Sequence, residues 1–375
     1  MKKEKQKITP WEVKGEVDYN KIVKEFGVER ISDKLLTKIK KHTKTLHPML
    51  TRKIFFAHRD MKWLLDEYEK GNKFFLYTGC GPSGPIHLGH LQVWYFTKWL
   101  QDVFDCELWF QFTDDEKFLI KNKSLGEIKK WMYENMLDVI AVGFNPKKTH
   151  FLIDTKHADL IYPQAIKVAK KITFSMVKSS FGLNESSNIG IIFFTSVQAV
   201  PAFLPSIIKN KKIPCLIPHA IDQDPHFRLT RDILPKLGHY KPASIQCSFL
   251  PPLTGSKGKM SSSQSIKAIL STDSPKTVAK KINKYAFSGG QPNTEEHRKK
   301  GGNPDVDVSF QYLKYMFEEN DEALNEIYND YKSGKMLTGE LKQLTIIKIN
   351  EFLRQHQKRR QEAKKKIDRF IYKND

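Results

Sequence analysis

The chain has 375 residues, 39% hydrophobic and 28% charged, which is typical of a soluble globular protein with two or three domains. No apolar run approaches the roughly 20 residues that cross a membrane, and the basic N-terminus lacks the apolar stretch of a secretory signal. These features exclude a membrane protein and predict a cytoplasmic one. The net charge of +21 favours a polyanionic partner, although a lysine-rich proteome produces the same excess.

Residues 1–70 are polar and hold two helix-forming patches, VDYNKIVKEFGV and ISDKLLTKIKKHT, which indicate an N-terminal extension that we place at 1–50. From residue 73 onward, short apolar runs alternate with longer amphipathic stretches. The expected strands are KFFLYT, CELWFQFT, HFLID, IPCLIPHAI and SIQCSFL, and the expected helices include LQVWYFTKWLQDVF and SLGEIKKWMYENMLDVIA. This alternation predicts an α/β domain at 51–263, with a doubly wound, mostly parallel sheet covered on both faces.

After residue 264 the strand signals stop, and amphipathic helix patterns take over in SPKTVAKKINKYAF, VSFQYLKYMFEE and LTGELKQLTIIKINEFLRQHQKRR. We predict a separate α-helical domain at 264–375. Its last segment, 351–375, holds nine Lys or Arg against four acids. Two interpretations of this charge remain open, the solvated face of a helix or a contact with RNA.

The stretch FFLYTGCGPSGPIHLGH fits two nucleotide-binding motifs at once. Gly79, Gly81 and Gly84 match the G-x-G-x-x-G of dinucleotide-binding domains. Pro85, however, removes a backbone donor, so we expect no helix to begin before His87. The next strand ends in two aspartates thirty residues beyond the last glycine, later than the acid that binds ribose in that motif. The dinucleotide interpretation is therefore weak.

The end of the same stretch, HLGH, indicates attack on a phosphate instead. A helix that begins near Leu88 and Gly89 points its first amides at an anion, and Gly89 lets a base or ribose approach the backbone closely. His87 and His90 would donate hydrogen bonds to oxygens that gain charge in the transition state. For the pair taken alone, two capping or core histidines remain the alternative.

No protein metal site is indicated. No third His or Cys lies near the HLGH pair at the spacing of a metal ligand. The four cysteines, at positions 80, 106, 215 and 247, form no C-x-x-C pair. We expect reduced thiols, and neither a disulfide framework nor a zinc ribbon.

A second loop, TGSKGKMSSS (254–263), follows an expected strand and combines glycines, lysines and serines. It is not a P-loop, because it lacks the four-residue spacing before the Gly-Lys-Ser/Thr end. A loop of this kind would bring Lys259 onto a triphosphate and neutralise the departing pyrophosphate. A flexible linker has the same composition, but the presence of HLGH upstream favours the phosphate-binding role.

These two segments resemble the signatures of class I aminoacyl-tRNA synthetases, since HLGH matches H-I-G-H and KMSSS matches K-M-S-K-S. From about Trp11 to the C-terminus, the chain resembles the tryptophanyl-tRNA synthetases of the eukaryotic and archaeal type. The stretches that carry this are FFAHRDM, LYTGCGPS, FTKWLQDVF, QFTDDEKFL, AIDQDPHFRLTRD, NKYAFSGG, EEHRKKGGNPDVDVSFQYL and MLTGELK. The resemblance implies a Rossmann-type domain that joins L-tryptophan to tRNA(Trp) through an adenylate, with ATP as substrate and Mg2+ bridging its phosphates.

By position, the resemblance assigns roles to residues around ATP. His87 and His90 would stabilise the transition state at the α-phosphate, and Lys259 would hold the pyrophosphate. The further ATP-binding residues would be Gly79, Gly81, Gly89, Asp222, Lys257, Met260, Ser261 and Ser262. Ser262 stands where the motif has its second lysine, and Lys257 is the candidate to replace that charge. Asp222 would meet either the ribose of ATP or the ammonium of the amino acid.

The resemblance also implies a tryptophan pocket. Tyr77 and Gln111 would accept the indole N–H, and Glu116, Gln198 and Gln223 would hold the ammonium and carboxylate. The residues alone favour ordinary packing at strand ends for Tyr77 and Gln111, and a surface acid in a turn for Glu116. Only the resemblance reverses this preference. A site built around the indole hydrogen bond should reject phenylalanine strongly, because its polar groups would lose their partner.

In this family the enzyme is a homodimer and its helical domain binds the anticodon, so the resemblance implies both here. Two other functions remain as alternatives. A tyrosyl-tRNA synthetase shares the fold and both signatures, and the amino acid that supports adenylate formation would distinguish it. A catalytically silent RNA-binding relative would lack signature residues, whereas both signatures are present in this sequence.

Overall fold

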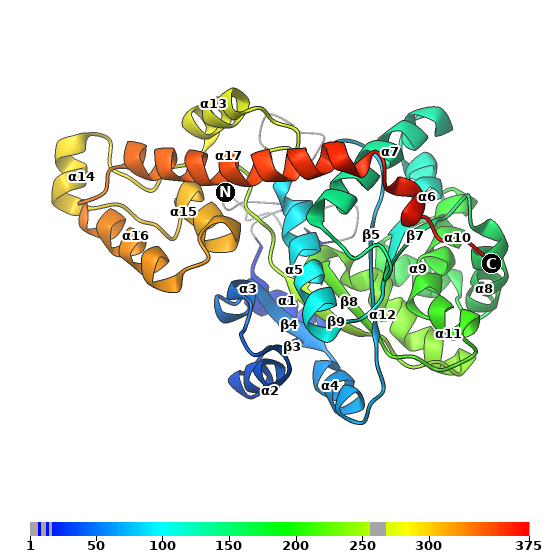
Figure 1. Ribbon diagram of the computed structural model, residues 1–375. Coiled ribbons are helices and arrows are strands. Elements are labelled where there is room, and N and C mark those ends of the chain that lie inside the picture. Colours follow the sequence, from blue (N-terminus) through cyan, green and yellow to red (C-terminus); the bar gives the residue numbers. More distant parts are fainter. Residues whose placement is uncertain (1–6, 9–12, 15–16, 256–267, 375) are drawn as a thin grey trace.

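The computed structural model describes residues 7–8, 13–14, 17–255 and 268–374. Its centre is a seven-stranded sheet in the order β3-β4-β9-β8-β5-β6-β7, with helices on both faces (Figure 1). The strands are β3 (Glu29–Arg30), β4 (Phe55–Arg59), β5 (Phe75–Cys80), β6 (Leu108–Phe112), β7 (Thr149–Ile153), β8 (Cys215–Ala220) and β9 (Ala243–Cys247). The short strands β1 (Lys7–Ile8) and β2 (Val13–Lys14) pair with each other.

The five strands from β9 to β7 are parallel, whereas β3 and β4 are antiparallel additions at one edge. All five strands expected after residue 73 are present, and the prediction of a doubly wound, mostly parallel sheet is confirmed. Strand β4 was not among the expected strands. Its apolar run is short and leads directly into charged residues, and only pairing with β9, far along the chain, gives it a place in the sheet.

Helices of the N-terminal and catalytic parts surround this sheet. They are α1 (Tyr19–Phe26), α2 (Asp33–Thr43), α3 (Pro48–Thr51), α4 (Met61–Glu69), α5 (Leu88–Phe104), α6 (Asp114–Ile120), α7 (Leu125–Val142), α8 (Ala158–Ala169), α9 (Phe174–Phe181), α10 (Ile189–Val197), α11 (Leu204–Ile208) and α12 (Asp224–Ile233). Short 3-10 turns lie at Val200–Ala202, Ile221–Gln223 and Leu234–Leu237. Within the described ranges, no helix combines the length and the hydropathy that crossing a bilayer requires.

Alternation of side chains along the strands gives each face of the sheet its own core. On one face, Leu76 and Phe110 belong to a buried cluster that includes residues of α5 and α7. On the other, Tyr77 and Trp109 belong to a cluster with α8 to α12, the helices between β7 and β9. Because both faces are covered, the strands are apolar along nearly their whole length, as parallel strands in such sheets are.

Chain order and strand order diverge between β5 and β8. From β5 the chain continues outward through β6 to β7, and it then returns to β8 on the other side of β5. Such a switch point leaves a crevice at the carboxyl ends of the two strands, where open α/β sheets bind their ligands. Cys80 ends β5 and Ala220 ends β8, so the motifs that follow these strands meet at this crevice.

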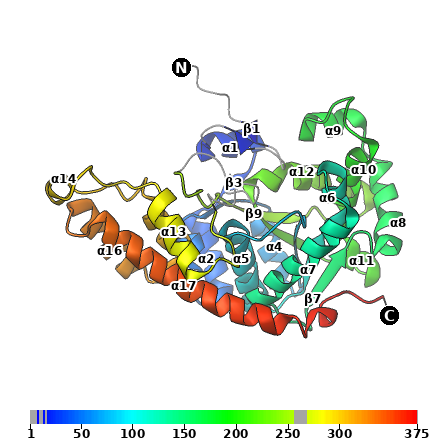
Figure 2. The same ribbon diagram turned by 90° about the horizontal axis from the view of Figure 1, so that it is seen from above.

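The C-terminal part is helical, as predicted. It contains α13 (Pro275–Tyr285), α14 (Thr294–Lys300), α15 (Val308–Tyr312), a π-helical turn (Leu313–Phe317), α16 (Asp321–Ser333), α17 (Thr338–Ala363) and a 3-10 turn (Ile367–Arg369). The long helix α17 packs against α13 along its length and against α7 toward its C-terminal end, and so connects the helical part to the sheet domain (Figures 1 and 2).

Contacts along α17 explain part of the basic charge in 351–375. Buried His356 bonds through Nε2 to a carboxylate oxygen of Asp138 in α7 at 3.0 Å, and Arg359 Nε donates to the backbone oxygen of Ala141 at 2.6 Å. These side chains hold the two parts of the molecule together. Lys358 is exposed and belongs to the solvated face of the helix.

Candidate active site

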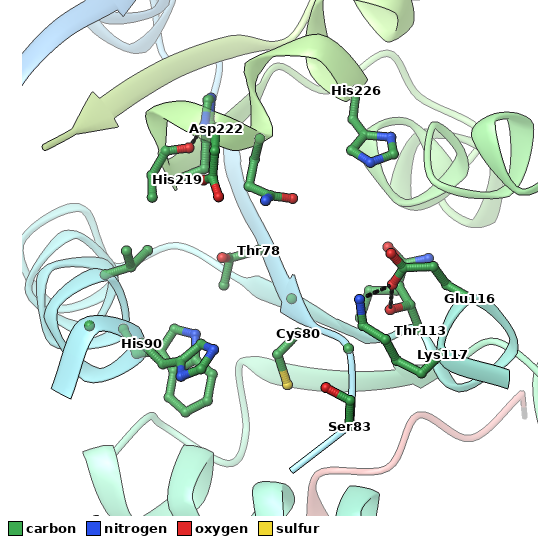
Figure 3. Close-up of a pocket in the computed structure, with 18 of the residues that line it drawn as sticks. Thr78, Cys80, Ser83, His90, Thr113, Glu116, Lys117, His219, Asp222 and His226 are labelled. Atoms are coloured by element: carbon green, nitrogen blue, oxygen red, sulfur yellow. Dashed lines mark hydrogen bonds and ion pairs between the residues drawn. The ribbon is translucent and has the colours of Figure 1, made fainter. Parts of the chain in front are cut away.

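A cavity of about 680 Å³ lies at the switch point, beyond the ends of β5, β6 and β8. In the close-up of Figure 3, His90 points into it from the start of α5, Asp222 from the turn after β8, and Glu116 from α6. Every site residue proposed from the sequence within the described part of the chain lines this one cavity. They are Tyr77, Gly79, Gly81, His87, Gly89, His90, Gln111, Glu116, Gln198, Asp222 and Gln223.

Close packing explains two glycines at the carboxyl end of β5. Gly79 is paired with Gln111 in the register of β5 and β6, and a Cβ at Gly79 would lie 2.5 Å from the backbone oxygen of Gln111. A Cβ at Gly81 would lie 1.7 Å from Cε of Lys117, whose side chain crosses the turn. Neither glycine has a φ in the left-handed region. Both are therefore required for close approach of neighbouring groups, and a ligand can approach the same bare backbone.

Helix α5 begins at Leu88, as Pro85 led us to expect. The backbone N–H of His87 donates to Nδ1 of His90 at 3.3 Å, and the two rings stack with centroids 3.9 Å apart. Because Nδ1 of His90 accepts this bond, the neutral ring carries its hydrogen on Nε2. His90 thus caps the helix and also lines the cavity, so the capping and functional interpretations are compatible.

Three polar side chains form a network in another part of the cavity lining. The Tyr77 hydroxyl donates to Oε1 of Gln111 at 2.6 Å, and Nε2 of Gln198 donates to the same oxygen at 3.1 Å. Burial raises the pKa of Tyr77 well above its usual value, so the hydroxyl remains a donor. The Phe227 ring stands edge-on to Tyr77 at 5.7 Å. This end therefore offers a buried carbonyl oxygen between apolar walls.

Glu116 is buried, so it is not the surface acid that its turn also suggested. Its Oε2 accepts from Oγ1 of Thr113 at 2.8 Å and pairs with Nζ of Lys117 at 2.8 Å (Figure 3). Near it, burial lowers the pKa of His226 to about 4, so this imidazole is neutral at physiological pH. A buried carboxylate beside a neutral histidine is suited to an ammonium group.

The turn after β8 presents Asp222 and Gln223 to the cavity. The next residue, Asp224, begins α12 and is held by Arg59 of β4. Nε and one terminal nitrogen of Arg59 donate to its two carboxylate oxygens at 3.0 and 2.9 Å, and both side chains are largely buried. This ion pair fixes the turn against the antiparallel edge of the sheet, which the sequence did not predict.

Lys257, Lys259, Met260, Ser261 and Ser262 lie outside the described residues. The chain on both sides of their loop is anchored at the site. Phe249 and Leu250 line the cavity before the loop. After it, the backbone N–H of Leu88 donates to the oxygen of Ile269 at 3.1 Å, and that of Ser271 donates to Ile86 at 2.9 Å. The segment that follows KMSSS is therefore paired directly with the segment that carries HLGH.

No group of three or more His, Cys, Asp or Glu side chains in the described part of the chain is placed to hold a metal ion. The acids that line the cavity, Glu116 and Asp222, come from separate elements, α6 and the turn after β8. Such a donor set does not form a cage for a resident cation. A magnesium ion at this site would be held chiefly by the phosphates of a nucleotide and by water.

A family model described as tRNA synthetases class I (W and Y) matches residues 208–354. Over 366 residues, covering 97% of this chain and 95% of the relative, the sequence is 52% identical to a tryptophan–tRNA ligase of Saccharolobus solfataricus. The chain belongs to the tryptophan–tRNA ligase family. Another family member, from Pyrococcus furiosus, is 49% identical over 371 residues, covering 98% of this chain and 94% of that relative.

Solved structures of tryptophanyl-tRNA synthetases share the fold. The enzyme from Giardia lamblia superposes with a TM-score of 0.89 at 39% identity, over 95% of this chain and 96% of that one. The enzyme from Encephalitozoon cuniculi, solved bound to tryptophan, gives 0.84 at 34% identity, over 95% and 100%. The resemblance proposed from HLGH and KMSSS is confirmed. The chain is an enzyme of the aminoacyl-tRNA synthetase class, for which ATP is a substrate.

Several residues that line the cavity of this chain were not predicted from the sequence. Lys117, Lys121 and Lys123 line the cavity together and concentrate positive charge there. The sequence signal for these lysines was the run DDEKFLIKNK, in which only Glu116 was proposed as a site residue. Positive charge on a concave surface attracts phosphate groups. His226 was missed as well, although it lies in the quoted stretch AIDQDPHFRLTRD.

Proposed function

We propose that this chain activates L-tryptophan with ATP and then transfers it to the 3′-terminal ribose of tRNA(Trp). The observation that carries the proposal is one cavity with two different ends. At one end Gln111 Oε1, a buried acceptor, lies between apolar walls. At the other, helix α5 begins beside His87 and His90. An acceptor between apolar walls suits an indole, and a helix N-terminus suits a phosphate.

At the amino-acid end, Tyr77 and Gln111 recognise the indole N–H. The indole takes the position on Gln111 Oε1 that Nε2 of Gln198 occupies in this structure, and Gln198 then turns toward the amino-acid backbone. Glu116 holds the ammonium group, with Gln198 and Gln223 completing the contacts to ammonium and carboxylate. Glu116 lines the same cavity as Tyr77 and the start of α5, which supports its contact with the substrate.

In the first step, a carboxylate oxygen of tryptophan attacks the α-phosphorus of ATP and pyrophosphate leaves. His90 Nε2–H and His87 donate to the non-bridging oxygens, which gain charge as the new bond forms. Gly79, Gly81 and Gly89 let the nucleotide lie against the backbone, and Asp222 meets the ribose or the ammonium. In the second step a ribose hydroxyl of tRNA attacks the carbonyl carbon and AMP leaves. The chain acts by positioning and charge stabilisation, without a covalent enzyme intermediate.

The loop 254–263 completes the nucleotide end in this proposal. Lys259 neutralises the departing pyrophosphate, with Met260, Ser261 and Ser262 beside it and Lys257 in place of the missing second lysine. The backbone pairing of Leu88 with Ile269 supports this, because it brings the chain that follows the loop to the start of α5. A magnesium ion held by the ATP phosphates would further neutralise their charge.

The remaining parts of the proposal concern partners and organisation. Residues 1–50 form the N-terminal extension, 51–263 the catalytic domain and 264–375 an anticodon-binding domain, whose lysines, arginines and aromatic rings suit a single-stranded RNA loop. We include a homodimer and a cytoplasmic location in the proposal. The exposed apolar side chains Tyr162, Ile166 and Ile189 support an interface on helices α8 and α10.

Amino-acid-dependent ATP–pyrophosphate exchange without tRNA tests the function directly. L-tryptophan, L-tyrosine and L-phenylalanine are compared with the full-length chain under identical conditions. We expect exchange with tryptophan alone. Exchange with tyrosine would keep the fold and the mechanism but overturn the proposed pocket. Absence of exchange with all three would point to the silent RNA-binding alternative.

A further inference from the structure

Asp154 stands directly behind the amide of Gln111. It follows the last residue of β7, and its backbone N–H donates to the oxygen of Phe112 in β6 at 3.2 Å. Nε2 of Gln111 donates to both of its carboxylate oxygens, at 2.9 and 3.0 Å. Gln111 is completely buried and Asp154 almost so. This contact is therefore a fixed element of the interior, inaccessible to solvent on the side of Gln111.

The carboxylate determines which end of the Gln111 amide faces the cavity. Only the nitrogen of an amide can donate to a carboxylate oxygen, so Nε2 faces Asp154 and Oε1 faces Tyr77 and Gln198. Rotation of the amide by half a turn would set Oε1 against the carboxylate oxygens. The same rotation would present an NH2 group to the cavity, where it would repel an N–H donor and accept nothing from it.

A second carboxyl group, Asp115, lies beside Asp154. Burial, and then the neighbouring charge of Asp115, raise the pKa of Asp154 well above its usual value, while burial raises the pKa of Asp115 to about 6. The two carboxyl groups are hydrogen-bonded to each other, and the charge of each disfavours ionisation of the other. Both oxygens of Asp154 still accept from Nε2 of Gln111.

Asp154 does not reach the substrate cavity. It lines a smaller cavity of about 250 Å³ on the other side of Gln111, together with Asp115, whereas Gln111 lines the large one. The two side chains thus form the wall between the cavities. Any influence of Asp154 on the amino acid passes through Gln111, which makes it a positioning residue.

We propose that Asp154 sets the preference for an indole N–H by holding the Gln111 amide with its carbonyl oxygen toward the substrate. The inference rests on the proposed activation of tryptophan. It identifies a determinant of specificity outside the residues that touch the amino acid. An analogue with sulfur in place of the indole nitrogen, 3-benzothienyl-L-alanine, has nearly the same shape and leaves Gln111 Oε1 without its donor. The wild-type chain is expected to discriminate against this analogue.

The test compares tryptophan with 3-benzothienyl-L-alanine in ATP–pyrophosphate exchange by the wild type and Asp154→Asn. An asparagine can donate as well as accept, so it no longer orients the Gln111 amide. We expect kcat/KM for tryptophan to fall about tenfold, mainly through KM, while the value for the analogue changes less than twofold. The ratio of the two values therefore falls about tenfold. Asp159→Asn, the same substitution on the exposed start of α8, should leave both values unchanged.

A merely structural role would lower kcat/KM for both substrates alike and leave their ratio intact, and that result would overturn the proposal. If Asp154→Asn does not fold, Asp154→Ser is measured in the same way, since its short hydroxyl cannot reach Nε2 of Gln111. The wild type separates this inference from the proposed function. Failure of the wild type to use tryptophan would contradict the proposed function itself. Normal exchange by the wild type, with an unchanged ratio of the two kcat/KM values in the variant, would contradict only the role of Asp154.

Discussion

The two ends of the cavity are built from different parts of the chain. The amino-acid end consists of buried side chains bonded to one another, with Tyr77, Gln198 and Asp154 all contacting the Gln111 amide. The nucleotide end consists largely of backbone, in a glycine turn after β5 and the first turn of α5. The difference suits the two ligands that we propose for these ends. An indole is distinguished by one N–H, whereas a triphosphate needs room, amide donors and positive charge.

The contrast predicts that changes at the amino-acid end alter substrate choice, whereas changes at the nucleotide end alter the rate. It also implies that each end depends on a different support in the sheet. The first depends on the parallel neighbours β5, β6 and β7, and the second on the antiparallel strand β4 through Arg59. The following variants separate these dependences.

Arg59→Ala should have the largest effect, on stability. It leaves the buried carboxylate of Asp224 without its partner, and loss of one member of a buried pair costs about 3–5 kcal/mol. The free energy of unfolding is measured by urea denaturation. Lys62→Ala, which removes an exposed pair with Asp66 only a few residues away, is the matched control and should change little. Equal stabilities of the two variants would contradict the anchoring role of Arg59.

Acidification should destabilise the amino-acid end through His226. Burial lowers its folded pKa to about 4, below the roughly 6.5 of an unfolded histidine, so the unfolded chain binds the proton first. The neutral ring contributes stability that is present above pH 6.5 and is lost as the pH falls toward 4, by about 3 kcal/mol. Urea denaturation across this range should show a smaller loss in His226→Gln than in the wild type. Parallel curves would rule out this histidine as the cause.

His90→Ala should slow adenylate formation by about 10²-fold, or about 2.7 kcal/mol, because a donor to the charged transition state is lost. The KM for tryptophan should stay within about twofold of the wild type, since the amino-acid end is intact. Lys259→Ala should slow the same step at least tenfold. Rates are measured by single-turnover formation of the adenylate. Near-normal rates in both variants would refute the catalytic assignment.

Tyr77→Phe should have the smallest of these effects and the opposite pattern. It removes the hydroxyl that donates to Gln111 Oε1 at 2.6 Å and leaves the ring in place. We expect kcat/KM for tryptophan to fall about tenfold through KM, with kcat nearly unchanged. Tyr133→Phe, at an exposed tyrosine of α7, is the control. A fall in kcat with unchanged KM would mean that the two ends are not separable.

Much of the fold could be predicted because local sequence patterns indicate its strands and helices. Apolar runs of strand length alternate with amphipathic helices from residue 73, and Pro85 located the start of α5 within a residue. Strand β4 and the packing of α17 on α7 could not be predicted in this way. Both depend on partners far along the chain, such as Asp138 for His356. The local periodicity of a sequence does not indicate such a contact.

The sequence by itself predicted the chemistry at the site. HLGH, KMSSS and the residues after each strand supply the groups that we propose to meet the phosphates and the amino acid. Only the tertiary structure decided how those groups are oriented. The strand order brings β7 beside β6, so that Asp154 stands behind Gln111, and it brings β8 beside β5, so that Asp222 faces His90 across one cavity. Motifs record residue types, whereas direction in space follows from register and from contacts between segments distant in the chain.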